Sequence, residues 1–253
     1  MTALAIGLLI GLTLGALGGG GSVLTVPALV YLLGQSARAA TSESLIVVGA
    51  AALGAVFAQA RAGSIRWGTA LGFGFAGIAA SYAGSAANAH VDPRVLLIAF
   101  AALMLVAAAA MHAQRGGTAA DRRRRSTARV VVRILAAGSL VGFLTGFLGV
   151  GGGFVIVPAL VMLLDFPMPE AVATSLLIIS INSGTALLAR AGDHTAIDWS
   201  LVIPFTAAAL AGSLAGRNLA TRLPAHVLRT AFTTLLLAVA SYTAYSAVTA
   251  RKI

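Results

Sequence analysis

The sequence predicts an all-α polytopic membrane protein, and three observations support that fold class. Hydrophobic residues make up 59% of the 253 residues and charged residues only 9%, and the mean hydropathy of +0.96 is far above the range of soluble domains. Most apolar stretches reach the ~20 residues that a helix needs to cross hydrocarbon. They also lack the short apolar–polar alternation of a membrane β-barrel. The stretches fall at residues 3–33, 39–60, 67–89, 93–112, 130–164, 171–190, 198–219 and 224–249.

The chain is duplicated internally. The segment GALGGGGSVLTVPALVYLL at residues 15–33 matches GFLGVGGGFVIVPALVMLL at residues 146–164 in 12 of 19 positions. Farther along, the tripeptide ATS and a tryptophan recur at matching places in both halves. Such a repeat predicts two homologous four-segment units. The predicted organisation is a membrane repeat over residues 1–113, an Arg-rich linker over residues 114–129 and a second membrane repeat over residues 130–253.

The first segment of each half is too long for a single crossing. Residues 3–33 as one helix would measure about 46 Å at ~1.5 Å per residue, against a hydrocarbon core of ~30 Å. Consecutive glycines at 18–21, and again within 149–153, destabilise a helix and predict a break in the first and fifth segments. Each break is either a kink in a tilted helix or the tip of a re-entrant hairpin. Pro27 and Pro158 are expected to kink the part that follows.

The charges of matched loops bear on the topology. Re-entrant first segments would make the two repeats inverted, and crossing first segments would make them parallel. Residues 60–66 contain two arginines and no acid, whereas the matching residues 190–198 contain one arginine and two aspartates. Opposite charge bias in matched loops favours inverted repeats. Seven of the 17 basic residues lie between 115 and 133, so the linker is expected on the cytoplasmic side.

The two glycine breaks are predicted to form a binding site for a small anion. Non-helical backbone survives in a membrane only where it is buried in protein or lines a polar cavity. A half-helix that starts near Ser22 or Gly153 would direct its positive dipole end and unpaired N–H groups into the interior. The ATS hydroxyls would add donors. The predicted substrate-binding residues are Gly18, Gly20, Gly21, Ser22, Thr41, Ser42, Gly149, Gly151, Gly152, Gly153, Thr174, Ser175 and Asn182.

Structural roles are the alternatives for these residues. The glycines could serve only helix packing, Thr41 and Thr174 could cap helix N-termini, and Asn182 could form an interhelical hydrogen bond. Glu43 is the only acid just inside an apolar segment, and Leu176 takes its place in the second half. Its carboxylate either complements a helix N-terminus or titrates as a coupling group. Glu43 is therefore the coupling candidate, with a proton or sodium as the coupling ion.

Composition argues against several other functions. The chain has no cysteine, and its four histidines lack the paired spacing of a metal site. No nucleophile has a matched base, so neither an enzyme, a metal nor a cofactor is expected. The net charge of +10 is concentrated beside apolar segments. Such basic residues fix the orientation of the chain in the membrane and attract anionic lipid headgroups, so the expected partner is membrane lipid and not nucleic acid. The sequence leaves homo-oligomerisation open.

The pair GALGGGGSVLTVPAL and GFLGVGGGFVIVPAL, each followed by ATS, resembles the sulfite exporter TauE/SafE family of membrane permeases, also known as 4-toluene sulfonate uptake permeases. The resemblance covers almost the full chain. It implies a secondary transporter that moves a small organosulfur or sulfur oxyanion, such as sulfite or a sulfonate, across the bacterial inner membrane with an ion gradient. The family's glycine and ATS elements fall on the residues named above, and Glu43 departs from the usual apolar residue. A passive anion channel and a transporter of another small anion or carboxylate are the alternatives.

Overall fold

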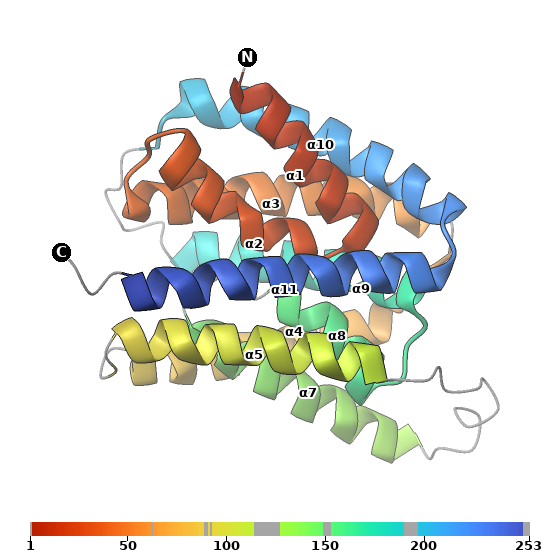
Figure 1. Cartoon of the computed structure of the whole chain (residues 1–253). Helices are drawn as coiled ribbons and strands as arrows, with labels where there is room; N and C mark the ends of the chain where they lie inside the picture. The colour runs from red at the N-terminus through yellow and green to blue at the C-terminus, as the bar shows by residue number, and fades with distance from the viewer. Residues whose placement is uncertain are drawn as a thin grey trace.

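The computed structural model describes residues 2–61, 63–88, 91, 93–113, 127–148, 153–189 and 197–249. The described residues form helices and short turns with no strand, which confirms the all-α class (Figure 1). Six helices contain apolar spans of 19 to 24 residues, long enough to cross a membrane: α3, α4, α7, α9, α10 and α11. The elements are α1 (Thr2–Leu17), α2 (Gly20–Pro27), the π-helix η1 (Ala28–Leu32), α3 (Ala37–Ala60), α4 (Trp67–Asn88), α5 (Pro93–Ala113), α7 (Thr127–Leu148), α8 (Gly153–Leu163), α9 (Met168–Ala189), α10 (Trp199–Arg222) and α11 (Ala225–Thr249).

The first apolar segment is two helices rather than one. α1 ends at Leu17, Gly18 adopts a left-handed φ of 68°, and α2 begins at Gly20. α2 then folds back along α1, because a Cβ added to Gly21 would lie 2.6 Å from the carbonyl oxygen of Ile10. In one continuous helix those two residues would be about 16 Å apart. The first break is therefore the tip of a hairpin and not a kink.

The fifth apolar segment is divided at the matching place. α7 ends at Leu148 and α8 begins at Gly153. Residues 149–152 lie outside the described residues, and so do three of the predicted substrate-binding positions, Gly149, Gly151 and Gly152. The predicted linker lies almost wholly outside them as well, because α5 ends at Ala113 and α7 begins at Thr127.

The two prolines affect their helices differently. Pro27 ends α2, and the chain continues as the wide π-helical turn η1. A proline removes one backbone donor and its ring crowds the carbonyl four residues earlier, and a local π turn accommodates both effects. Pro158 lies inside α8, which continues as an α-helix to Leu163.

Glycines spaced four residues apart along α1 and α7, here called the glycine stripes, hold the two halves together. The first helix of each half lies in parallel against a helix of the other half, α1 on α10 and α7 on α4. A Cβ added at any stripe position would lie 2.8 Å or less from the facing carbonyl oxygen. Only glycine therefore allows the two backbones to approach this closely. The facing positions are Gly7 with Phe205, Gly11 with Ala209, Gly15 with Ser213, Gly138 with Phe73, Gly142 with Gly77 and Gly146 with Ser81.

Matched helices of the two halves also pair directly, α3 with α9 and α5 with α11. α5 and α11 run in opposite directions across Figure 1. The α3 and α9 pair is antiparallel too: Gly49 faces Ser183, and Arg66, just beyond α3, bonds to Thr174 near the start of α9. Inverted repeats require such opposed directions, and the inverted membrane topology stays a prediction.

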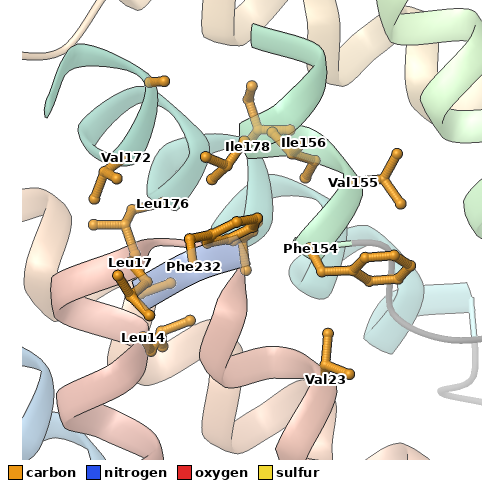
Figure 2. Close-up of a cluster of buried hydrophobic side chains, with 14 of the residues drawn as sticks. Leu14, Leu17, Val23, Phe154, Val155, Ile156, Val172, Leu176, Ile178 and Phe232 are labelled. Carbon is orange, nitrogen blue, oxygen red and sulfur yellow. The ribbon is translucent and has the colours of Figure 1, made fainter. Parts of the chain in front are cut away.

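The hydrophobic core lies where the α1–α2 hairpin meets α8 and α9 at the centre of the bundle (Figure 2). Side chains from α1, α2, α8, α9 and α11 converge there, and most are completely buried. The core therefore anchors α1, α2 and α8, which are too short to cross a membrane alone. The labelled members are Leu14, Leu17, Val23, Phe154, Val155, Ile156, Val172, Leu176, Ile178 and Phe232.

Candidate functional site

The two glycine breaks touch each other. A Cβ added to Gly19 would strike the carbonyl oxygen of Gly153, and one added to Gly153 would strike the hydroxyl of Ser22. A Cβ on Gly18 would lie 2.5 Å from Ser175 Oγ. The first hairpin tip thus meets the start of α8 with no room for side chains, which gives these glycines a packing role.

The remaining described glycines of the first break are packed as well. A Cβ on Gly20 would lie 2.9 Å from a methyl of Leu235, and Gly21 faces α1 as described above. Both glycines are buried. Gly18, Gly20, Gly21 and Gly153 do not line either of the cavities described next, and their binding of a substrate stays a prediction.

A cavity of about 400 Å³ lies beside the start of α2, bounded by helices of both halves. Its polar surface comes from hydroxyls, and among the described residues that line it none is charged. Its apolar surface comes mainly from valines of α2, α3 and α11, with Pro27, Leu45 and Phe100. The lining therefore suits a small ligand with both a polar and an apolar part. The hydroxyl residues are Ser22, Tyr31, Thr41, Ser44, Ser81, Ser85, Thr145, Ser183, Tyr242 and Thr243.

One wall of the cavity is fixed by an aromatic pair. Phe100 of α5 packs edge to face on Phe154 of α8, with ring centroids 5.1 Å apart and an interplanar angle of 77°. Both rings are almost fully buried. Such a pair is rigid and adds to the packing free energy of the site.

Five of the lining hydroxyls donate to carbonyl oxygens three or four residues earlier in the chain, at 2.7–2.8 Å. They belong to Ser22, Ser44, Ser81, Thr145 and Thr243. Each of these local hydrogen bonds contributes only about 1 kcal/mol to the stability of the fold. Rotation about χ1 therefore redirects each O–H toward a bound acceptor at modest cost.

A second cavity of about 200 Å³ adjoins the first and shares Ser81, Ser85 and Thr145 with it. Asn182 and Thr185 of α9 also line it. Asn182 Oδ1 is buried and has no hydrogen-bond partner within the described part of the chain. The two cavities adjoin each other between α4, α7 and α9.

The predicted binding residues divide into two groups. Ser22 and Thr41 line the larger cavity and Asn182 lines the smaller one. The other ATS hydroxyls are buried away from both cavities: Thr174 Oγ1 accepts the N–H of Arg66 at 3.3 Å, and Ser175 donates within its own helix. Ser42 is also buried outside the two linings.

The N-capping alternative for the ATS threonines is wrong. α3 begins at Ala37, and its N-cap is Ser36, whose Oγ accepts the N–H of Ala39 at 3.2 Å. α9 begins at Met168. Thr41 and Thr174 therefore lie inside their helices, because each helix begins about one turn or more before the motif.

Several cavity hydroxyls were not predicted. Ser81 and Ser85 repeat at the four-residue spacing that places side chains on one helix face, which is a weak signal in the sequence. Thr145 directly precedes a glycine of the α7 stripe. Nothing local distinguishes Ser44, Ser183 or Thr243 from hydroxyls that bond within their own helices, so only the assembled bundle identifies them.

Glu43 of α3 does not line the cavity, and its side chain is fully buried. Its Oε1 accepts the backbone N–H of Asp198 at 3.1 Å. Its Oε2 is buried without a hydrogen-bond partner among the described residues. An ionised carboxylate with a bare oxygen in a protein interior is costly. The side chain thus links the first half to the start of α10 through one carboxylate oxygen only.

Asp198 itself caps α10. Its Oδ1 accepts the N–H groups of Ser200 at 3.1 Å and Leu201 at 3.3 Å, and the Ser200 hydroxyl at 2.6 Å. The hydroxyl bond from Ser200 lowers the pKa of Asp198, so the cap is charged at neutral pH. The matching residue before α4 is Arg66, which pairs with Glu170 at 3.0 Å.

Comparison with known proteins agrees with this architecture. The sequence profile of the family described as "Sulfite exporter TauE/SafE" matches residues 3–243. A "Probable membrane transporter protein" of Xylella fastidiosa is 32% identical over 92% of this chain and 90% of its own length. A probable membrane transporter protein of Methanocaldococcus jannaschii is 26% identical over 70% of this chain and 67% of its own. No solved structure matches the chain with significance.

The profile match spans both glycine breaks and the cavity walls. It also spans the contacts of α1 with α10 and of α7 with α4, which form the seams between the halves. The helical bundle with membrane-length spans is the architecture that a multi-pass transporter needs. Sequence, fold and relatives therefore agree, and the chain belongs to the sulfite exporter TauE/SafE family of membrane transporters.

Proposed function

We propose that the protein is a secondary transporter in a bacterial inner membrane, and that it moves a small organosulfur or sulfur oxyanion, such as sulfite or a sulfonate. The larger cavity is the substrate site. The observation that supports this assignment is the combination of about 400 Å³ of space, ten hydroxyl-bearing side chains and no charged lining residue within the described chain. Its position between the two halves matches the place where transporters with internal repeats bind substrate.

The chemistry of the lining supports an oxyanion. Serine and threonine hydroxyls can each donate one hydrogen bond, and several that converge can replace the water around the oxygens of a sulfonate or sulfite group. A site of this kind holds a singly or doubly charged anion without a fixed counter-charge, so release remains easy. The valines and Phe100 accommodate the apolar body of an organic anion.

Glu43 is the proposed coupling group. Protonation of its bare Oε2 removes an unsolvated charge from the interior, and deprotonation restores it. Because Oε1 holds the backbone at the start of α10, a change in that charge acts on the contact between the two halves. A proton gradient can therefore drive relative motion of the halves around the cavity. Sodium is the alternative coupling ion.

A thermal-shift screen tests the substrate class. The purified protein in detergent is heated with sulfite, sulfoacetate, ethanesulfonate and acetate, with tetramethylammonium as the control cation. A ligand that binds only the folded state raises the unfolding temperature by mass action. Stabilisation by the sulfur anions and none by tetramethylammonium is expected. Equal responses to anions and cation contradict the proposal.

Flux in proteoliposomes tests the transport mechanism. Uptake of the stabilising anion is measured with and without an imposed pH or sodium gradient, and with a protonophore. Accumulation against the substrate gradient that the protonophore abolishes is expected for proton coupling. Flux that follows the substrate gradient alone, at the same rate under every ion gradient, identifies a passive anion channel instead.

A further inference from the structure

The smaller cavity is built on a close backbone contact between the two halves. Gly77 of α4 and Gly142 of α7 line it, and a Cβ added to Gly142 would strike the backbone of Gly77. Ser81 and Thr145 follow these glycines by about one turn on the same two helices and also line the cavity. The contact of the two backbones therefore fixes how far apart these two hydroxyl-bearing residues lie.

The oxygens around this cavity are available as acceptors. Three of its hydroxyls donate their protons to carbonyl oxygens of their own helices, at 2.7–3.0 Å. A hydroxyl has one proton and two lone pairs, so the lone pairs of these three oxygens remain for a ligand. Asn182 Oδ1 is a fourth acceptor, buried and without a hydrogen-bond partner in the described chain, and Ser85 adds a fifth oxygen. The three hydroxyls are those of Ser81, Thr145 and Thr185.

A lining of neutral acceptor oxygens suits a monovalent cation. Proteins bind sodium and potassium by replacing their hydration shell with such oxygens. Calcium and magnesium sites rely on carboxylates, and none of the described residues that line the cavity is charged. The volume of about 200 Å³ leaves room for water on the ion as well. The chemical class of ligand is therefore an alkali cation.

The counter-charge for this cation lies in the larger cavity. A cation held only by neutral groups inside a membrane protein is costly. Ser81, Ser85 and Thr145 line both cavities. A hydroxyl that donates to an anion in the larger cavity presents a lone pair to a cation in the smaller one, and the cation strengthens that donation. Opposite charges on the two sides of these hydroxyls attract each other, so each ligand stabilises the other.

We propose that the smaller cavity binds an alkali cation together with the anion of the larger cavity. The assignment rests on the proposed function, because the anion supplies the counter-charge, and it gives sodium a place in the fold. Glu43 lines neither cavity, so a proton on Glu43 and the cation bind at different places. Ser85 is exposed and lies one turn before the end of α4, and the ion enters from that end. The ligands are Asn182 Oδ1 and the hydroxyl oxygens of Ser81, Ser85, Thr145 and Thr185.

Titration calorimetry on the full chain in detergent tests the proposal. Ethanesulfonate and sulfite are titrated at one ionic strength in sodium gluconate, potassium gluconate or N-methylglucamine gluconate. The Kd of the sulfur anion is expected to be at least about tenfold lower with sodium or potassium than with N-methylglucamine, because coupled ligands raise each other's affinity by the same factor. Equal Kd values in all three media overturn the cation site and leave the substrate assignment intact.

Variants of two ligands locate the cation. Asn182→Leu removes Oδ1 at similar volume, and Thr185→Val removes a hydroxyl. Both should make the Kd of the anion independent of the cation. Asn218→Leu is the matched control, because Asn218 is an exposed residue of α10 that lines neither cavity, and it should keep the full dependence. Full dependence in both cavity variants contradicts the site, and either variant suffices if the other fails to fold.

Asn182→Asp tests the cation site without an anion. Its carboxylate supplies the missing counter-charge, so sodium alone should raise its unfolding temperature by mass action, with no such rise for the control Asn218→Asp. No sodium effect on Asn182→Asp overturns the cation site. A sodium effect there, combined with no binding of any sulfur anion to the wild type, supports the cation site and contradicts the substrate assignment.

Discussion

The seams between the halves and the walls of the cavity differ in how far the two repeats keep the same residues at matched positions. In the seams, both halves keep the glycines of the first helix: Gly11 lies against Ala209 as Gly142 lies against Gly77. In the cavity, Thr145 faces space while its repeat partner Leu14 is packed in the core. The two first helices must approach a neighbouring backbone in either half, so their glycines have no substitute.

The cavity walls have no such requirement. A bundle with this backbone can hold either small polar or larger apolar side chains at the wall positions, provided that the total volume fills the available space. The duplication therefore fixes the backbone arrangement twice, whereas the side chains decide where a cavity remains. The following predictions separate these two kinds of position.

The largest effect is expected in the seams. Gly142→Ala places a methyl group on the backbone of Gly77, and the helices must separate, at a cost of about 3 kcal/mol or more. Gly68→Ala is the matched control, because a Cβ there meets nothing within 4 Å. Thermal unfolding in detergent measures both. Similar unfolding temperatures for the two variants would contradict the close approach of α4 and α7.

An exchange of residues between the cavity wall and its partner is expected to have the next largest effect. Thr145→Leu fills space in the cavity, so it should abolish the thermal shift by sulfite or ethanesulfonate with little loss of stability. Leu14→Thr removes packing from a fully buried position and should lower stability by about 2–3 kcal/mol while leaving the shift intact. A loss of ligand response in both variants, or in neither, contradicts the asymmetry.

Glu43 and Leu176 are another repeat pair with different residues. Glu43→Gln keeps an acceptor for the N–H of Asp198 but cannot change its charge. Uptake driven by a pH gradient is expected to fall at least about tenfold, while the ligand-induced thermal shift persists. Glu43→Leu, which installs the residue of the second half, should behave in the same way. Unchanged proton-driven uptake by both variants removes Glu43 from the coupling mechanism.

The smallest effects are expected at Arg66 and Asp198, the matched residues before α4 and α10. Glu170→Gln breaks an ion pair whose Arg66 side chain is 58% exposed and should change stability by less than about 1 kcal/mol. Asp198→Ala removes the N-cap of α10 and should lower the unfolding temperature slightly.

The cap at Asp198 also gives a pH dependence. The pKa of Asp198 is lowered in the folded protein, so its contribution to stability is present above the unfolded value and is lost as the pH falls through the folded value. The unfolding temperatures of the wild type and Asp198→Ala should therefore move closer together as the pH falls from 7 into the range below the ordinary pKa of an aspartate. A difference between them that does not change with pH contradicts a charged cap.

The helical class and the two breaks could be predicted because each depends on local chemistry. Hydropathy identifies the apolar segments, and consecutive glycines cannot sustain a helix in hydrocarbon. Glycines four residues apart along α1 and α7 are typical of close helix contacts. On the partner helix α4 a glycine alone does not indicate a contact: Gly84 packs against α7, but Gly68 faces open space, because only tertiary packing decides which of several small residues meets a neighbour.

The candidate site was predicted only in part for a related reason. Ser22 and Thr41 stand in repeated motifs, so the sequence singles them out, and both line the cavity. Thr174 and Ser175 stand in the same motif and are packed elsewhere. Serines and threonines such as Ser183 or Thr243 are ordinary in apolar helices, where they bond to their own backbone. Whether such a residue faces a cavity depends on side chains contributed by distant helices.

The sequence by itself determined that the chain is a duplicated helical membrane protein whose first and fifth segments are interrupted by glycine, because hydropathy, repetition and backbone freedom are properties of short stretches. The tertiary structure decided that the first interruption is a hairpin tip, that this tip touches the start of α8 at Gly153, and that Thr145 faces a hydroxyl-lined cavity while its repeat partner Leu14 is packed in the core. Those outcomes depend on which side chains from different helices occupy the same volume, and a linear pattern does not contain that information.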